Sequence, residues 1–231
     1  MIQSVTDTYV FIPGGWQGGW AFDPITERLT NLNKKCFSLT LPGLELDQQE
    51  QDRIINLDTH IQFVVDFILR ENIHNVILCG YSYSGMVITG CADRIPERIK
   101  ALVYIDAYVP KHGDSCWTLT NDIFRNIFAT GAGHDGMTVA VPTGGDIRRR
   151  PHPLAAFMQN LQLNGNHERI LNRAFIYHTG WANTPFTSQF ESLKNSPQWL
   201  IETLDCGHNA MRESPDKLTQ LLCDLEARYR H

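Results

Sequence analysis

The sequence lacks the features that mark several large classes of protein. None of its apolar runs is long enough to span a bilayer, and no basic and apolar leader precedes the first strand-like run, so neither a membrane segment nor a secretory signal is expected. The net charge of −5 provides no cationic surface for nucleic acid or for an anionic membrane. We therefore expect a cytoplasmic protein with no nucleic-acid partner and no membrane partner.

Paired cysteines are also missing. The six cysteines are scattered along the chain, and no two of them form a CxxC pair. Cys79 lies inside the apolar run 76–79, where a thiol behaves as a small apolar side chain. We expect buried, reduced thiols rather than disulfides. The absence of clustered cysteine and histidine spacing predicts that the chain has no zinc site.

The chain does contain short apolar runs that alternate with longer amphipathic segments. Strands are predicted at residues 9–13, 36–41, 76–79, 101–105, 174–177 and 199–204. Helices are predicted at residues 23–32, 58–70, 84–94 and 215–229, with Asp58 as the N-cap of the second and Pro215 in the first turn of the last. This alternation predicts an α/β fold, with a mostly parallel sheet of about six strands and helices on both faces.

One long segment interrupts the alternation, between the strands at 101–105 and 174–177. At roughly sixty residues it is far longer than an ordinary connection between two strands. It contains Trp117, Phe124 and Phe128, so it is too apolar for a disordered linker. We expect residues 1–231 to form a single domain, in which residues 111–172, approximately, form a cap inserted over one end of the sheet.

The segment 78–85 reads Leu-Cys-Gly-Tyr-Ser-Tyr-Ser-Gly and lies between a predicted buried strand and a predicted helix. A serine on so sharp a turn is strained and exposes its Oγ, and the residues two positions before and after it must be small. Gly80 and Ser84 meet this requirement for Ser82, whereas the bulky Met86 would follow Ser84 at that position. The sequence therefore predicts Ser82 as a nucleophile. The alternative is that this segment is only a tight turn between a strand and a helix, with no catalytic role.

A histidine in a loop after the last predicted strand is the best candidate for a general base. His208 follows Gly207, and a side chain there can reach across the carboxyl edge of the sheet. Imidazole has a pKa near the working pH, and the order of nucleophile first and base last also fits. Among the other histidines, His60 is expected to be solvated on its helix. His152 and His178 could line the site or serve the fold.

Glycines follow the first predicted strand, in the segment 13–20. Glycine-rich backbone after a strand lets amide groups converge on an anion, and an oxyanion hole needs two such donors. We assign them to the backbone of Gly15 or Trp16 and to the backbone of Tyr83, the residue after the predicted nucleophile. A dinucleotide-binding loop is the rival interpretation, but the segment contains no GxGxxG and no acidic residue at the required distance.

Over nearly its whole length the chain resembles the α/β-hydrolase superfamily, in particular the branch of plant methylesterases, hydroxynitrile lyases and related small bacterial esterases. The resemblance is carried by the segments 14–20, 80–85, 105–110, 151–154 and 207–211. It implies ester chemistry that needs neither a metal nor an organic cofactor. Relatives usually carry His at the positions of Pro13 and Tyr81 in this chain. Neither difference removes a catalytic group, but both change the surroundings of the oxyanion.

The acid that would orient the base lies where this chain departs from many relatives. In many relatives it follows the strand before the last, but residues 178–185 of this chain contain no Asp or Glu. Asp106 ends the strand directly after the nucleophile strand, a position that some relatives use. Neighbouring parallel strands lie about 4.8 Å apart, so its carboxylate can reach His208. Asp106 is the predicted acid; the other candidates are Asp205, Asp114 and Glu202.

The predicted activity is hydrolysis of a small carboxylic ester through a Ser82–His208–Asp106 triad and an acyl-enzyme. The expected partner is an apolar or aromatic small molecule, in a pocket lined by Tyr81, Trp117, Phe124, Phe128 and Trp181. The cap aromatics could equally form the cap's own core.

Other functions on the same scaffold stay open, because a fold does not fix a reaction. They are a lyase, a lactonase, a C–C hydrolase, a cyclase and a non-catalytic small-molecule binder, and a homodimer is also compatible with the sequence. Hydroxynitrile lyases of the resembling branch place Lys directly after the catalytic His. This chain has Asn209 at that position, which argues against cyanohydrin chemistry.

Overall fold

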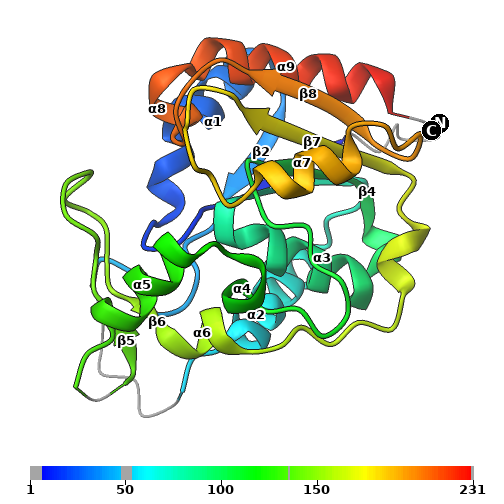
Figure 1. Ribbon diagram of the computed structural model, residues 1–231. Coiled ribbons are helices and arrows are strands. Elements are labelled where there is room, and N and C mark those ends of the chain that lie inside the picture. Colours follow the sequence, from blue (N-terminus) through cyan, green and yellow to red (C-terminus); the bar gives the residue numbers. More distant parts are fainter. Residues whose placement is uncertain (1–6, 48–53, 135, 230–231) are drawn as a thin grey trace.

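The computed structural model describes residues 7–47, 54–134 and 136–229. Its main sheet contains β1 (Thr8–Ile12), β2 (Lys35–Ser38), β3 (Val76–Tyr81), β4 (Ile99–Ile105), β7 (Asn172–His178) and β8 (Leu200–Leu204). The six strands are all parallel and lie in the order β2-β1-β3-β4-β7-β8 (Figure 1). The predicted α/β fold with a parallel sheet of about six strands is confirmed.

The central strands are apolar on both faces because helices cover both faces of the sheet. Successive side chains of a strand point to opposite faces. In β1, Tyr9 and Phe11 belong to one hydrophobic cluster, whereas Val10 and Ile12 belong to the other. Continuous apolar runs, rather than alternating ones, are what a parallel sheet buried on both faces requires.

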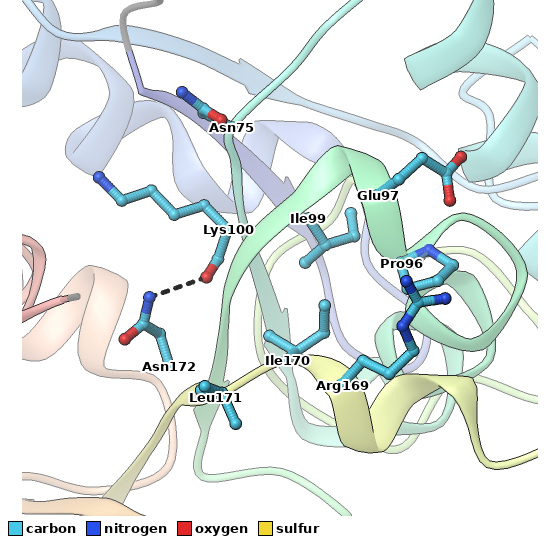
Figure 2. A pocket seen from close by; sticks show the side chains of 9 residues that line it. All are labelled: Asn75, Pro96, Glu97, Ile99, Lys100, Arg169, Ile170, Leu171 and Asn172. Carbon is cyan, nitrogen blue, oxygen red and sulfur yellow. Dashed lines mark hydrogen bonds between the residues drawn. The ribbon is translucent and has the colours of Figure 1, made fainter. Parts of the chain in front are cut away.

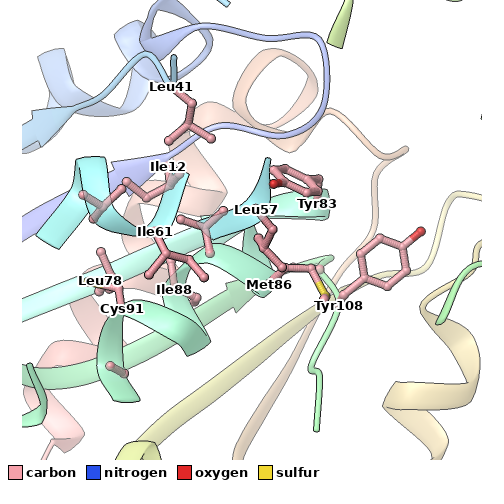
Figure 3. Packing of buried hydrophobic residues seen from close by; sticks show 14 of the residues in the cluster. Ile12, Leu41, Leu57, Ile61, Leu78, Tyr83, Met86, Ile88, Cys91 and Tyr108 are labelled. Atoms are coloured by element: carbon pink, nitrogen blue, oxygen red, sulfur yellow. The ribbon is translucent and has the colours of Figure 1, made fainter. Parts of the chain in front are cut away.

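Two sets of helices enclose the sheet. On one face lie α1 (Asp23–Asn31), α8 (Ala210–Glu213) and α9 (Pro215–Arg228), and on the other lie α2 (Leu57–Arg70) and α3 (Gly85–Arg94) (Figure 1). The second face is shown in Figure 3, where Leu57 and Ile61 of α2 pack with Met86 and Ile88 of α3 over Leu78 of β3. Burial of such side chains contributes roughly 25 cal/mol per Å² of apolar surface and fixes the helices on the sheet.

The predicted helix starts are correct at Pro215, which lies in the first turn of α9, and wrong at Asp58. The N-cap of α2 is Asn56, whose side chain accepts a hydrogen bond from the backbone of Thr59 at 2.9 Å. The Thr59 hydroxyl donates to the same Asn56 oxygen and lies 3.3 Å from the Asn56 amide, completing a capping box. A two-residue error of this kind arises because Asp in the first turn and Asn at the cap both favour a helix start.

The long segment between β4 and β7 is folded. It contains α4 (Cys116–Leu119), α5 (Asp122–Gly131) and α6 (Leu154–Met158), together with a small antiparallel pair formed by β5 (Thr138–Val139) and β6 (His152–Pro153). In Figure 1 these elements gather beside the ends of α2 and α3. That residues 111–172 act as a cap on a single domain stays a prediction.

Two further expectations concern the whole chain. Within the described ranges, no helix is both long and apolar enough to cross a membrane. All six cysteines are free, and four of them are buried: Cys79, Cys91, Cys116 and Cys206. Burial raises the pKa of the Cys91 thiol to about 12, so this thiol stays protonated near neutral pH.

Candidate active site

Ser82 lies on the turn between β3 and α3, as the first residue of the short 3-10 helix η2 (Ser82–Ser84). Its backbone has a left-handed φ of 55°, a conformation that costs a non-glycine residue on the order of 1–3 kcal/mol. A Cβ on Gly80 would lie 2.6 Å from the Ser84 carbonyl oxygen, so the turn does require a small residue there. Ser84 itself is buried and donates its hydroxyl to the Pro13 carbonyl, which leaves Ser82 as the accessible hydroxyl.

Asp106 follows β4 directly, on the strand next to the one that carries Ser82. Its φ of 42° is also left-handed. The side chain is 0% exposed, and its Oδ1 accepts a hydrogen bond from the backbone amide of His178 at 3.3 Å. A buried carboxylate of this kind needs donors for its oxygens, and His178 and His208 supply them.

His208 lies in the loop between β8 and α8 and joins the other two side chains. Its Nδ1 is 2.7 Å from Oδ2 of Asp106, and its Nε2 is 3.1 Å from Oγ of Ser82. Since a carboxylate only accepts, Nδ1 carries the proton and Nε2 is free to accept the Ser82 hydroxyl. The three side chains therefore form a continuous chain of hydrogen bonds across three strand ends.

The loop that carries His208 is itself held in place. The imidazole Nδ1 of His178 donates to the His208 carbonyl at 3.1 Å, and the Gly207 amide donates to the Glu213 carboxylate at 2.6 Å. Burial lowers the pKa of His178, although the charge of Asp106 opposes this effect. His178 thus stays a neutral donor that contacts both the loop and, through its own backbone, Asp106.

The other acids considered from the sequence lie elsewhere. Asp205 is exposed, and its carboxylate lies 3.5 Å from the Thr179 hydroxyl. Glu202 pairs with Arg228, and Asp114 accepts a hydrogen bond from the Lys111 amide at 2.8 Å. Within the described ranges, none of these three carboxylates has a hydrogen bond to His208.

Of the amides considered for an oxyanion hole, that of Trp16 is engaged elsewhere. It donates to Nδ1 of His152 at 3.2 Å, in a buried hydrogen bond. This hydrogen bond occupies the Trp16 amide and therefore favours Gly15 over Trp16 as the first donor. The amide of Tyr83 lies in the first turn of η2, where backbone amides have no partner within the helix.

Several aromatic rings surround the His208 imidazole. Trp181 is half-buried, and its ring centroid lies 4.2 Å from that of His208. The ring of Tyr81 lies 4.6 Å from His208 on another side and also packs against Gly14, where a Cβ would be 2.9 Å from its Cδ1. Tyr81 is 3% exposed and therefore packed within the protein, whereas Trp181 is half-buried and is the more accessible of the two rings.

The aromatic residues of the long insert divide into two groups. Phe124 and Trp117 are half-buried at the edge of the core, and the Phe124 ring lies 5.9 Å from that of Trp181. Phe128 is only 2% exposed and stacks on Phe157 with ring centroids 4.3 Å apart. The expectation that Phe128 lines the pocket is corrected by this packing: its ring belongs to the core beneath the insert.

The prediction that His60 is solvated is wrong. It is 0% exposed, its Nε2 donates to the Pro42 carbonyl at 3.0 Å, and its Nδ1 accepts from the Tyr83 hydroxyl at 2.9 Å. Burial lowers the pKa of His60 to about 4, so the ring is neutral near pH 7. The spacing Leu57, His60, Ile61 and Val64 on one helix face was a signal that could have indicated burial.

One cluster in the site has the composition of a metal centre. Ligand atoms of Asp106, His178 and His208 lie within 4.8 Å of one another. The same atoms already make hydrogen bonds, however: His208 Nδ1 to Asp106 and His178 Nδ1 to the His208 carbonyl. A metal ion would have to displace both bonds, so this donor set fits a hydrogen-bonded network better than a metal site.

A separate cavity of about 450 Å³ lies at the opposite edge of the sheet (Figure 2). It is bordered by residues at the starts of β3, β4 and β7, and there the side-chain Nδ2 of Asn172 donates to the Lys100 carbonyl at 3.1 Å. Ligands of open α/β sheets bind at the carboxyl ends of the strands, where Ser82 lies. This cavity is therefore not part of the candidate site. Its lining consists of Asn75, Pro96, Glu97, Ile99, Lys100, Arg169, Ile170, Leu171 and Asn172.

Known proteins are similar to this chain over most of its length. The family model described as the alpha/beta hydrolase family matches residues 9–221. The chain belongs to the alpha/beta hydrolase family. It is 32% identical to a carbendazim hydrolyzing esterase of Nocardioides sp. (strain SG-4G), over 94% of this chain and 98% of that protein. It is 22% identical to Methylesterase 10 of Arabidopsis thaliana, over 99% of this chain and 95% of the relative.

Solved structures show the same fold for this hydrolase. An extracellular alpha/beta-hydrolase from a Paenibacillus species superimposes with a TM-score of 0.80 at 19% identity, and the match covers 94% of this chain and 98% of the other. The resemblance drawn from the sequence motifs, to the branch that contains methylesterases and hydroxynitrile lyases, is confirmed by these relatives.

Proposed function

We propose that this hydrolase cleaves a small carboxylic ester, with Ser82 as nucleophile, His208 as general base and Asp106 as the acid that orients it. The proposal is carried by one observation: Asp106, His208 and Ser82 form a chain of hydrogen bonds of 2.7 and 3.1 Å. The esterase names of the relatives from Nocardioides and Arabidopsis support the same reaction class.

The first half of the reaction forms an acyl-enzyme. His208 Nε2 takes the proton of the Ser82 hydroxyl as Oγ bonds to the ester carbonyl carbon. The carbonyl oxygen becomes an oxyanion, which the amides of Gly15 and Tyr83 stabilise, and Asp106 stabilises the imidazolium. The carbon–oxygen bond to the alcohol then breaks, and His208 returns the proton to the leaving alcohol.

The second half releases the acid. Water takes the place of the alcohol, gives a proton to His208 Nε2 and attacks the acyl carbon. The bond to Ser82 Oγ breaks, the serine regains the proton from His208, and the carboxylic acid leaves. Every proton transfer in this cycle uses Nε2 of His208. The contact with Asp106 keeps the proton on Nδ1, the other ring nitrogen.

An apolar or aromatic substrate suits the surroundings of the proposed nucleophile. The Trp181 ring contacts the His208 ring, and the Phe124 ring contacts that of Trp181. Both side chains are half-buried, so they can contact a bound molecule. Because the Nocardioides relative is named for hydrolysing carbendazim, that compound belongs in the substrate panel beside short-chain aryl esters.

Covalent labelling tests the proposed nucleophile. Wild type and Ser82→Ala are incubated with a p-nitrophenyl alkylphosphonate, which loses p-nitrophenolate when an activated serine oxygen bonds to phosphorus. We expect one adduct per wild-type chain, on the peptide that contains Ser82, and none on the variant. Peptide mass spectrometry locates the adduct.

An unfolded control gives this experiment a clear outcome. Unfolded wild type should stay unlabelled, because activation of Ser82 depends on the folded contact with His208. A folded wild type that stays unlabelled would favour the non-catalytic binder over the hydrolase, and an adduct on another residue would show that Ser82 is not the nucleophile.

A further inference from the structure

Trp16, in the glycine-rich loop after β1, has a backbone conformation that is unfavourable for its residue type. Its φ is 65°, in the left-handed region that bulky side chains rarely adopt. Such a conformation persists only where the surroundings hold it, and it concentrates at functional sites. Trp16 directly follows Gly15, so whatever holds Trp16 also sets the position of the Gly15 amide.

The contacts that hold Trp16 come from the long insert. Its amide donates to Nδ1 of His152 at 3.2 Å, and its indole N–H donates to the Val139 carbonyl at 3.1 Å. Its carbonyl accepts from the Arg150 amide at 3.0 Å. All three partners lie within residues 139–152, so the insert holds both the backbone and the side chain of Trp16 by hydrogen bonds.

His152 is placed to act as a fixed acceptor in this arrangement. It is 0% exposed and stacks on the Phe157 ring, with centroids 4.1 Å apart and the ring planes 13° apart. Its Nδ1 can accept the Trp16 amide only while unprotonated, and burial, aided by nearby His60, lowers the pKa of His152 well below its usual value. The ring is therefore neutral and closely packed.

A similar contact holds the other side of the proposed oxyanion hole. The Tyr83 hydroxyl donates to His60 Nδ1 at 2.9 Å, and the rings of His60 and His152 lie 5.6 Å apart. The His152 ring also lies 4.8 Å from that of Tyr83. Trp16, next to the proposed donor Gly15, and Tyr83, the other proposed donor, therefore both contact a buried pair of histidines. His152 belongs to the insert and His60 to α2.

We propose that His152 is a positioning residue, which fixes the backbone of residues 14–16 by accepting the Trp16 amide and thereby presents the Gly15 amide to the oxyanion. The insert then takes part in shaping the oxyanion hole. This inference rests on the proposed reaction at Ser82. Misplacing an oxyanion donor costs on the order of 10²–10³ in rate.

The test compares His152→Leu with His152→Asn. The two replacements share a skeleton of four heavy atoms that branches at Cγ, but only asparagine carries an acceptor near the position of the imidazole Nδ1. We expect His152→Leu to lower kcat for a p-nitrophenyl ester by about 10²-fold with little change in KM, and His152→Asn to stay within about 10-fold of wild type.

A second readout separates positioning from packing. An aryl trifluoromethyl ketone forms an adduct with the serine that places an oxyanion in the hole, so its Ki should rise in His152→Leu by the same factor as kcat/KM falls. Equal losses in both variants, or a Ki that stays at the wild-type value in His152→Leu, would overturn the proposal. Thermal melting of each variant shows whether the fold is kept.

Failure of the underlying reaction has a different signature. If wild-type hydrolysis is unchanged by Ser82→Ala, the proposed function fails, and the role of His152 fails with it. If hydrolysis depends on Ser82 while His152→Leu turns over as fast as wild type, only the positioning role is overturned.

Discussion

Replacing Asp106 with asparagine is expected to lower kcat by about 10⁴-fold while the fold is kept. The carboxylate receives two hydrogen bonds, from His208 Nδ1 at 2.7 Å and from the His178 amide at 3.3 Å. Asparagine offers one oxygen for these two donors. If its NH₂ group faces His208, Nδ1 must accept instead, and Nε2 then carries a proton and cannot take that of Ser82.

A matched variant distinguishes Asp106 from the acid nearest to His208 in sequence. Asp205→Asn makes the same chemical change on an exposed side chain that has no hydrogen bond to His208 within the described residues, so its turnover should stay within about 2-fold of wild type. The measurement is steady-state hydrolysis of a p-nitrophenyl ester, with circular dichroism to compare folds. An active Asp106→Asn, or an inactive Asp205→Asn, would mean that the acid has been assigned to the wrong strand.

Replacing Gly85 with alanine is expected to destabilise the protein by more than about 4 kcal/mol, enough to prevent accumulation of folded chain. A Cβ at this position would lie 1.8 Å from the Tyr108 carbonyl oxygen. That oxygen belongs to backbone anchored by the hydrogen bond from the Tyr108 amide to the Ser82 carbonyl, at 3.1 Å. The clash therefore cannot be relieved by rotating a side chain.

Gly113→Ala is the control for the general cost of adding a methyl group. Gly113 has a φ of 87°, and nothing lies within 4 Å of the position of its Cβ, so only backbone strain of about 1 kcal/mol is expected. The yield of soluble, folded chain is compared for both variants, and urea denaturation measures the stability of Gly113→Ala and of any Gly85→Ala protein that accumulates. A Gly85→Ala protein with the stability of Gly113→Ala would show that the segment after β4 does not pass as close to the nucleophile turn as described.

The sheet could be predicted from the sequence because its strands are short apolar runs separated by amphipathic helices. Such runs identify strands that are buried on both faces, and alternation with helices implies parallel order. The candidate nucleophile, base and acid could be predicted for a related reason. Ser82, Asp106 and His208 each follow a strand, and the carboxyl ends of parallel strands meet at one edge.

Contacts between segments far apart in the chain could not be predicted in this way. His152 lies 136 residues from Trp16, and no local pattern indicates that its Nδ1 receives the Trp16 amide. The pocket role expected of Phe128 failed for a similar reason, because aromatic content alone does not distinguish a side chain that faces a ligand from one that stacks on Phe157. His60 is different, since its helical spacing did carry the signal of burial.

The central claim is that Ser82 performs ester hydrolysis with His208, and one comparison tests it most directly. Hydrolysis of short-chain p-nitrophenyl esters is measured for wild type, Ser82→Ala and His208→Ala at the same enzyme concentration. The account predicts turnover by wild type and only the buffer rate for both variants, with all three folded. Turnover by Ser82→Ala equal to that of wild type would contradict the account.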